Sequence, residues 1–350
     1  MKLGIIGLPQ SGKLTIFRAL TGAREITSKE GVKKGDHLIE TVNVPDERID
    51  HLARIFKPKK TVYSKIEYLL PITTFDSGHS KGEEGSAMLN AVRVCDGLIY
   101  VLKNFQLFGE TPPVPEEDFF KLESDMILND LMVAEKRIEK IEADTKKGKE
   151  TFTDELDLLK RCYNVLSENK PLRDSSEITS SPLLRGFTFL SGKPILVISN
   201  NSDEDEVAPK MSCLSENIEV IVVRGKLEME LAEMDPEEAQ EFLSAFHVES
   251  SLIGRVIKSS LSASDLISFF TVEGNEARSW TIAKGTSALD AADHIHSDMK
   301  TGFIRAEVLP YKDFARYESI PEARKYGHLR LEGKEYIVQD GDIIKFRFNI

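Results

Sequence analysis

A short run of residues near the start of the chain has the composition and spacing of a phosphate-binding loop. The letters GLPQSGK at 7–13 follow the pattern G-x-x-x-x-G-K, whose backbone amides surround phosphates while the lysine reaches the terminal ones. In the full pattern the next residue is a serine or threonine that binds Mg²⁺, and here it is Leu14. The predicted phosphate-binding residues are Gln10, Ser11, Gly12, Lys13, Leu14 and Thr15. The alternative interpretation is a tight strand-to-helix turn without a ligand.

Such a loop needs a strand before it and a helix after it, and the sequence predicts both. Residues 2–7 form an apolar strand, and the helix that follows Gly12 ends at Gly22. Further short strands rich in Ile, Leu and Val are predicted at 66–70, 97–103, 194–200 and 219–223. Helical stretches separate several of them, which is typical of an α/β fold with a mainly parallel sheet and helices on both faces.

The stretch 105–190 interrupts this alternation of strands and helices. Apolar residues in 123–143 follow a heptad spacing, and a second apolar stripe runs from Leu156 to Leu166. We predict an antiparallel helical hairpin, a coiled coil, inserted between strands of the sheet. Its predicted tip carries Lys146, Lys147 and Lys149. These lysines are interpreted either as solvated side chains or as contacts to an acidic surface such as RNA.

From about residue 266 the pattern becomes that of a small α+β domain. A hairpin is predicted around Gly274-Asn275, followed by a helix over 288–299. The remaining strands are predicted at 303–308, 329–331, 335–338 and 343–350. We expect a mixed sheet with one helix on one face.

Composition excludes several classes of protein. The formal charge of −12 argues against a generally basic nucleic-acid-binding protein. The sequence contains no run of 18 or more apolar residues, so no membrane-spanning helix is predicted. Cys95, Cys162 and Cys213 have neither metal-binding nor disulfide spacing, which indicates a reducing compartment such as the cytoplasm.

Blocks of sequence along almost the entire chain resemble the YchF family, also called Obg-like ATPases. They include the loop at 7–13, VPD at 44–46, GFIRAEV at 302–308, LRLEGK at 329–334 and VQDGD at 338–342. The resemblance implies a GTPase-like P-loop nucleotide-binding domain at 1–104 and 191–265, the hairpin insert at 105–190 and a ubiquitin-like TGS domain at 266–350. It also implies a cytoplasmic protein that binds a purine nucleotide, ATP or GTP, and associates with ribosomes or RNA.

The positions that hold Mg²⁺ in this family are substituted. Besides Leu14, the strand-end aspartate of the family's D-x-x-G is replaced by Leu70 or Pro71, and 31–37 lacks the switch threonine. The nearby Asp76-Ser77-Gly78 is interpreted as a loop turn or as a shifted substitute. We therefore expect no metal-ligating and no catalytic side chain, weak or lost hydrolysis, and a doubtful role for Mg²⁺.

A second cluster matches the base-reading position of the family. The predicted base-contacting residues are Asn200, Asn201, Asp203 and Gly225. The short carboxylate of Asp203 favours guanine, while Asn201 in place of the usual lysine favours adenine. The alternative is an acidic turn that caps a helix or is simply solvated.

The favoured function is a nucleotide-binding, YchF-like protein with weak or lost hydrolysis. Two alternatives stay open. One is an active Mg²⁺-dependent ATPase or GTPase with a non-standard metal site, and the other is a nucleotide-independent adaptor that binds ribosomes or RNA.

Overall fold

The computed structural model describes residues 1–23, 37–72, 88–148, 153–212, 214, 218–235, 238 and 252–349. The chain divides into two compact units, the first formed by 1–41 and 67–256 and the second by 42–66 and 257–350. The predicted boundaries place 42–66 in the P-loop domain. The structure corrects this, because apolar residues of this segment pack on the C-terminal sheet. None of the helices in the described ranges is long and apolar enough to cross a bilayer.

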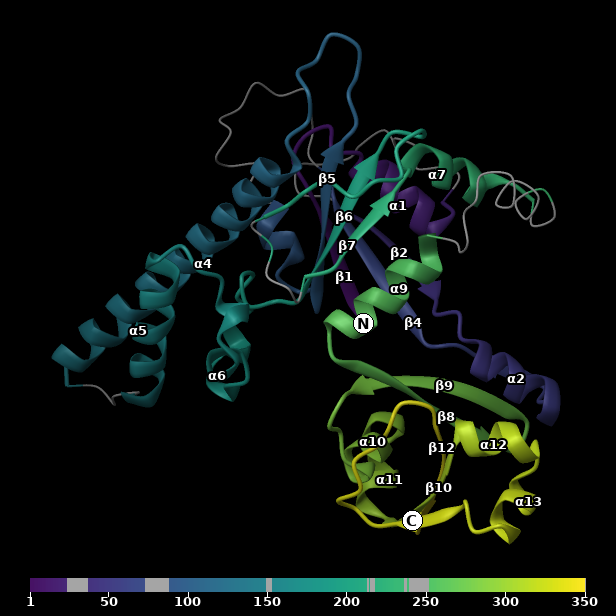
Figure 1. The fold of residues 1–350 in the computed structure, drawn as a ribbon. Helices are drawn as coiled ribbons and strands as arrows, with labels where there is room; N and C mark the ends of the chain where they lie inside the picture. The colour runs from purple at the N-terminus through teal and green to yellow at the C-terminus, as the bar shows by residue number, and fades with distance from the viewer. Residues whose placement is uncertain are drawn as a thin grey trace. The chain divides into compact units, whose positions relative to one another are not determined.

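The first unit is built on a six-stranded sheet with the order β2-β4-β1-β5-β6-β7 (Figure 1). Its strands are β1 (Lys2–Ile6), β2 (His37–Asn43), β4 (Lys65–Pro71), β5 (Gly97–Asn104), β6 (Ile195–Asn201) and β7 (Val220–Val223). The pairs β1–β4, β1–β5, β5–β6 and β6–β7 are all parallel. The five strands predicted for this sheet and their parallel arrangement are confirmed. The edge strand β2 was not predicted, because its residues are mostly exposed and lack an apolar run.

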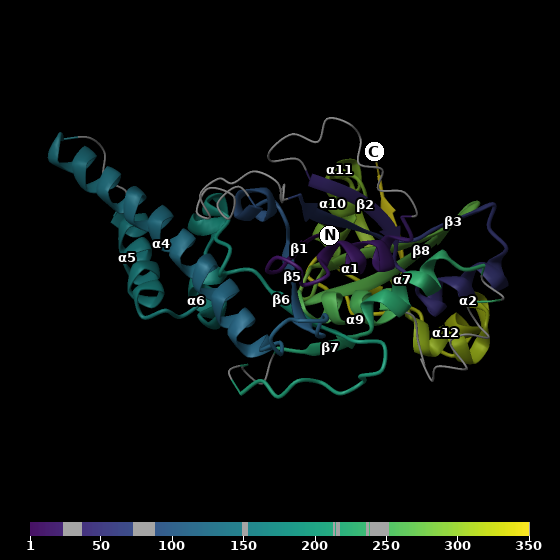
Figure 2. The ribbon, with the colours of Figure 1, turned by 90° about the horizontal axis from the view of Figure 1, so that it is seen from above.

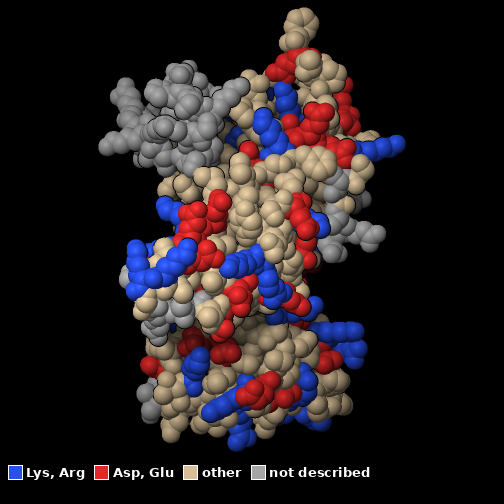
Figure 3. Space-filling view, turned by 90° about the vertical axis from the view of Figure 1, so that its left-hand side faces the viewer, with Lys and Arg blue, Asp and Glu red and all other residues tan. Residues whose placement is uncertain are grey.

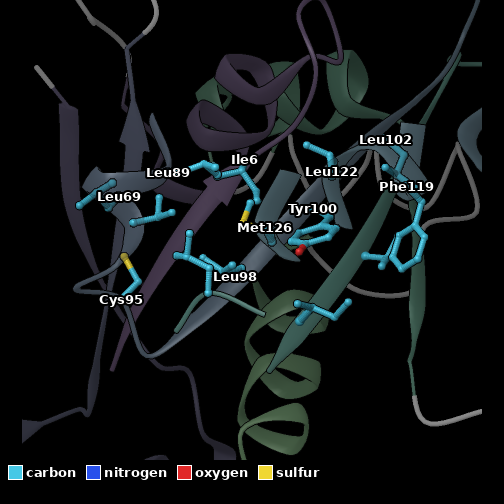
Figure 4. Packing of buried hydrophobic residues seen from close by; sticks show 14 residues of the cluster. Ile6, Leu69, Leu89, Cys95, Leu98, Tyr100, Leu102, Phe119, Leu122 and Met126 are labelled. Carbon is cyan, nitrogen blue, oxygen red and sulfur yellow. The ribbon is translucent and has the colours of Figure 1, made fainter. Parts of the chain in front are cut away.

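Helices cover both faces of this sheet, as predicted. On one side α4 (Pro115–Lys146) places Phe119, Leu122 and Met126 against apolar side chains of β1, β4 and β5, and Figure 4 shows these side chains packed together. On the other side α1 (Lys13–Thr21) and α7 (Gly225–Glu233) pack against each other (Figures 1 and 2). Helix α9 (Leu252–Ala263) is the next described helix after α7 along the chain.

Helices α4 and α5 (Thr153–Ser167) lie side by side and form the predicted hairpin (Figure 2). Their shared apolar seam includes Ile141 of α4 and Leu159 of α5. Gly148 follows α4 with a positive φ of 76°, and Lys149 lies outside the described residues. The short helices η1 (Leu172–Asp174), α6 (Ser176–Thr179) and η2 (Pro182–Phe187) then lead back to β6.

The second unit contains a mixed sheet with the order β11-β10-β12-β8-β9-β3. Its strands are β3 (Lys60–Val62), β8 (Leu266–Glu273), β9 (Glu276–Ala283), β10 (Phe303–Pro310), β11 (Arg330–Glu332) and β12 (Asp342–Phe348). The hairpin at Gly274-Asn275 and the strands predicted at 303–308, 329–331 and 343–350 are confirmed. The strand predicted at 335–338 is wrong, because only a single bridge joins Ser287 to Ile337.

Helices also cover both faces of the second sheet, so the expectation of one helix on one face is wrong. The predicted helix 288–299 is two helices, α10 (Ala288–Ile295) and α11 (Ser297–Thr301), since His296 has an extended backbone and its side chain caps α11. Helices α2 (Glu47–Phe56), α12 (Tyr311–Tyr317) and α13 (Ile320–Lys325) cover the opposite face. The neighbours Phe269 and Phe270 on β8 show why both faces are covered, because each is buried in a different apolar cluster.

Candidate nucleotide site

The predicted phosphate-binding residues form a tight loop between β1 and α1. Gln10 and Gly12 have positive φ values of 61° and 87°, and Gly12 is the N-terminal cap of α1. The loop is closed by a hydrogen bond from the Ser11 amide to the Leu8 carbonyl. The first amides of α1 therefore follow directly on the turn, where the positive end of the helix favours an anion.

The Lys13 ammonium lies inside this loop. It donates hydrogen bonds to the carbonyl oxygens of Gly7 at 2.9 Å and Leu8 at 2.8 Å. Burial lowers the pKa of Lys13 to about 8, because removing a cation from water favours its neutral form. A positive charge and the helix end thus converge on one small region.

If the predicted phosphate-binding residues hold a nucleoside triphosphate, the lowered pKa of Lys13 should make its binding sensitive to pH. We expect the affinity to change little near pH 7 and to fall by up to about tenfold per pH unit above about 8. The reason is that the bound anion requires the protonated lysine, while the phosphates themselves are already ionised in this range. Equilibrium titrations at pH 7, 8 and 9 measure the effect. In a Lys13→Arg control the guanidinium stays charged over this range, so the affinity of a variant that still binds should not change with pH. A wild-type affinity that does not change with pH would contradict the role of Lys13 in phosphate binding.

Asn200 connects the phosphate-binding loop to the beginning of α7. Its amide donates to the Ser11 carbonyl at 3.0 Å, and its carbonyl oxygen accepts from the Gly225 amide at 3.1 Å. A Cβ atom at Gly225 would lie 2.5 Å from that oxygen, so the approach requires glycine. The structure therefore brings together two of the predicted base-contacting positions. Because both ends of the Asn200 side chain bond to the protein, its role in this geometry is to position the loop.

Asn201 is almost fully buried, and protein groups occupy its side chain. Its oxygen accepts from Ser199 and Asn104, and its amide donates to the carbonyls of Asp205 and Val207. These bonds hold the end of β6 against β5 and fix the acidic turn that follows. Asp203 is exposed on this turn, so a base contact from either residue stays a prediction. Residues 202–212 contain no helix, so the turn does not cap one there.

The described residues at the positions that hold Mg²⁺ in the related pattern do not fit this ion. Leu14 is 48% exposed at the first turn of α1, and Leu70 and Pro71 at the end of β4 are buried apolar residues. Mg²⁺ requires oxygen ligands in octahedral geometry, and Thr15 is displaced from Leu14 by about 100° around the helix. The alternative ligand Asp76 and the segment 31–36 lie outside the described residues.

A cavity of about 570 Å³ adjoins the phosphate-binding loop and was not predicted. It lies between Leu8 and Pro9 of the loop, Lys103 at the end of β5, and the first turn of α4. The other lining residues are Glu110, Thr111, Pro112, Pro113, Val114, Glu117 and Asp118. The sequence did contain one signal for it, because Lys103 ends a buried strand at the same sheet edge as the loop.

Tyr100 on β5 is completely buried. Its hydroxyl donates to Glu123 at 2.6 Å, and Glu123 also pairs with Arg173 at 2.5 Å. Burial is the main reason that the pKa of Tyr100 is raised well above its usual range. Tyr100 is therefore a neutral hydrogen-bond donor, and the polar network around it was not visible in the sequence.

Comparison with known proteins shows similarity over the full chain. The family model YchF-GTPase_C, described as "Protein of unknown function (DUF933)", matches residues 266–349. "Ribosome-binding ATPase YchF" of Bacillus subtilis is 37% identical over 366 residues, covering 99% of each chain. The protein of the same name from Buchnera aphidicola is 34% identical, covering 100% of this chain and 99% of the relative. The solved YchF GTPase of Schizosaccharomyces pombe superposes with a TM-score of 0.81 at 27% identity, covering 99% of this chain and 97% of that one.

Proposed function

The chain belongs to the YchF family, and on this premise we propose that it binds a purine nucleoside triphosphate, ATP or GTP, through residues 10–15. The observation that carries the proposal is the placement of the Lys13 ammonium within the loop that Gly12 joins to the positive end of α1. The carbonyls of Gly7 and Leu8 satisfy this ammonium in the free protein, and a bound phosphate replaces them.

We further propose that hydrolysis of the nucleotide is weak or lost, although the relatives are named ATPases. Hydrolysis on a loop of this type depends on positioning and on neutralisation of the phosphate charge, much of it by Mg²⁺. Leu14 offers no oxygen, and the end of β4 is apolar. The described residues thus include the groups proposed to bind phosphate, but they do not include the usual oxygen ligands of Mg²⁺.

Association with ribosomes or RNA in the cytoplasm is the third part of the proposal, supported by the names of the relatives. The basic tip of the hairpin, with Lys146, Lys147 and Lys149, and the predicted TGS domain at 266–350 are the proposed contact regions. Positive and negative side chains are interspersed on the face drawn in Figure 3. A contact to RNA through this face would therefore use a local cluster of charges rather than a broadly basic surface.

Equilibrium binding of labelled ATP and GTP, first with Mg²⁺ and then with EDTA, tests the nucleotide proposal. We expect the affinity to be similar in both conditions and to fall by about tenfold or more in Lys13→Ala, which loses a charge-assisted contact. We also expect release of phosphate in the presence of Mg²⁺ to stay at the level of that variant. Turnover that Lys13→Ala abolishes would instead show an active enzyme, and no binding of either nucleotide would favour the nucleotide-independent adaptor.

A further inference from the structure

Two separate observations place Lys103 beside the phosphate-binding loop. It lines the same cavity as Leu8 and Pro9 of that loop. Its ammonium also lies 5.2 Å from the centre of the Phe105 ring, and that ring has an atom 3.9 Å from the position that a Cβ atom on Gly12 would take. The flexible stem of a lysine spans several ångströms, so the loop is within reach of a change in side-chain rotamer.

The partner of Lys103 in the free protein is Glu110. Their ion pair is only partly exposed, with 17% of the Lys103 side chain and 31% of the Glu110 side chain accessible. Glu110 follows a turn in which its amide donates to the Leu107 carbonyl, and its own carbonyl accepts from Gln106. The pair therefore joins the end of β5 to the loop that leads into α4.

In the described part of the chain, the cavity is lined by acidic side chains and by one basic side chain, that of Lys103. Of the described residues that line it, Glu110, Glu117 and Asp118 are acidic and Lys103 alone is basic. Partial burial raises the pKa of Asp118, because it disfavours the charged form of a carboxyl group. An anion that enters from the side of the loop would meet the positive charge of Lys103, which is paired with Glu110, and two further carboxyl groups.

We propose that Lys103 is a second phosphate-binding lysine, which leaves Glu110 and pairs with the terminal phosphate of a nucleoside triphosphate bound at residues 10–15. This inference rests on the proposed nucleotide binding. A terminal phosphate carries more charge than a carboxylate and offers more acceptor oxygens, so the exchange of partners is favourable. The ammonium supplies positive charge at a site where Leu14 and the end of β4 provide no ligands for a metal ion.

The distinguishing measurement compares ATP with ADP, because only ATP carries the terminal phosphate. In EDTA, Lys103→Gln should bind ATP about tenfold more weakly than the wild type, while its affinity for ADP changes by less than about twofold. Lys103→Arg keeps the charge and should retain most of the preference for ATP. Glu110→Gln removes the competing carboxylate and should bind ATP more tightly. The matched control is Lys170→Gln, which breaks the exposed Lys170–Glu168 pair in the turn after α5 and should change neither affinity.

The outcomes separate this inference from the proposed function. If the wild type binds ATP or GTP, but Lys103→Gln weakens ATP and ADP equally or not at all, the role of Lys103 is refuted and the nucleotide site stands. If the wild type binds no nucleotide, both are refuted. If Lys103 has a purely structural role, Lys103→Gln should have a lower thermal midpoint but the same ratio of ATP affinity to ADP affinity as the wild type. Lys103→Arg and Lys103→Gln should then have the same ratio.

Discussion

Replacing Arg173 by alanine is expected to lower the free energy of unfolding of the first unit by about 3–5 kcal/mol. The two guanidinium nitrogens of Arg173 lie 2.5 Å and 3.1 Å from the Glu123 oxygens, and the side chains of both residues are about nine-tenths buried. Removing the arginine leaves a carboxylate in the interior with Tyr100 as its remaining donor. Urea denaturation followed by the helical circular dichroism signal measures the change.

The control for this variant is Arg161→Ala. Arg161 pairs with Glu177 at 2.6 Å, but more than half of each side chain is exposed, so its loss should cost less than about 1 kcal/mol. The double variant Glu123→Leu/Arg173→Met removes both buried charges and should recover part of the stability, because it also leaves the Tyr100 hydroxyl without its acceptor. Equal effects of Arg173→Ala and Arg161→Ala would contradict the claim that burial makes the first pair important.

The same network connects three separate elements of the first unit. Tyr100 belongs to β5, Glu123 to α4 and Arg173 to η1. A further link comes from Asp130 on α4, whose carboxylate accepts from the backbone amides of Leu190 and Ser191. Buried polar groups have few alternative partners, so these bonds fix where the helical hairpin leaves the sheet and where the chain returns to it.

Apolar periodicity predicted most of the first sheet because its strands are buried on both faces. A run such as 98–102 must be apolar throughout when helices cover it on both sides, and this part of β5 has this pattern. Strand β2 is exposed along most of its length and left no such signal. The same reasoning failed at 335–338, where the backbone of Tyr336 and Val338 bonds to Gly333, Thr286 and the first residue of α10, Ala288, rather than to a strand partner.

The association of 42–66 with the C-terminal sheet could not be predicted from local patterns. Three residues of β3 pair with β9, more than 200 positions further along the chain. Arg48 adds an ion pair of 2.7 Å to Asp340. Ile49 and Leu52 of α2 belong to the apolar cluster that also contains Phe270 of β8. Each contact joins segments that are remote in sequence, whereas periodicity reports only on neighbours within one element.

The candidate site shows the same division between local and remote information. The phosphate-binding loop depends on residues next to one another, so its pattern was visible in the sequence. The bonds that occupy Asn201 and the ion pair of Lys103 involve loops whose course the sequence did not define. The prediction for Asn201 and Asp203 rested on their position at the end of β6 and just after it, and on a match to a base-reading pattern. Such a pattern carries no information on the carbonyl groups of Asp205 and Val207, to which the Asn201 amide donates.

Replacing Gly12 by alanine is expected to weaken binding of the nucleoside triphosphate by about 100-fold or more, the largest effect on binding that we expect. At φ 87° an alanine is strained by about 1–3 kcal/mol. Its Cβ atom would also lie 2.1 Å from the Asn200 amide nitrogen. That amide cannot turn away freely, because Asn200 bonds to Ser11 at one end and to Gly225 at the other. Equilibrium titration with labelled ATP or GTP measures the loss.

Gly22 provides the matched control at the other end of the same helix. It also has a positive φ, 65°, but a Cβ atom there would meet nothing within 4 Å. Gly22→Ala should therefore cost about 1 kcal/mol of stability and leave nucleotide affinity almost unchanged. If Gly12→Ala bound as tightly as Gly22→Ala, the close approach of Asn200 to the loop would not matter for binding. If both variants lost affinity equally, the stability of α1 rather than the shape of the loop would control the site.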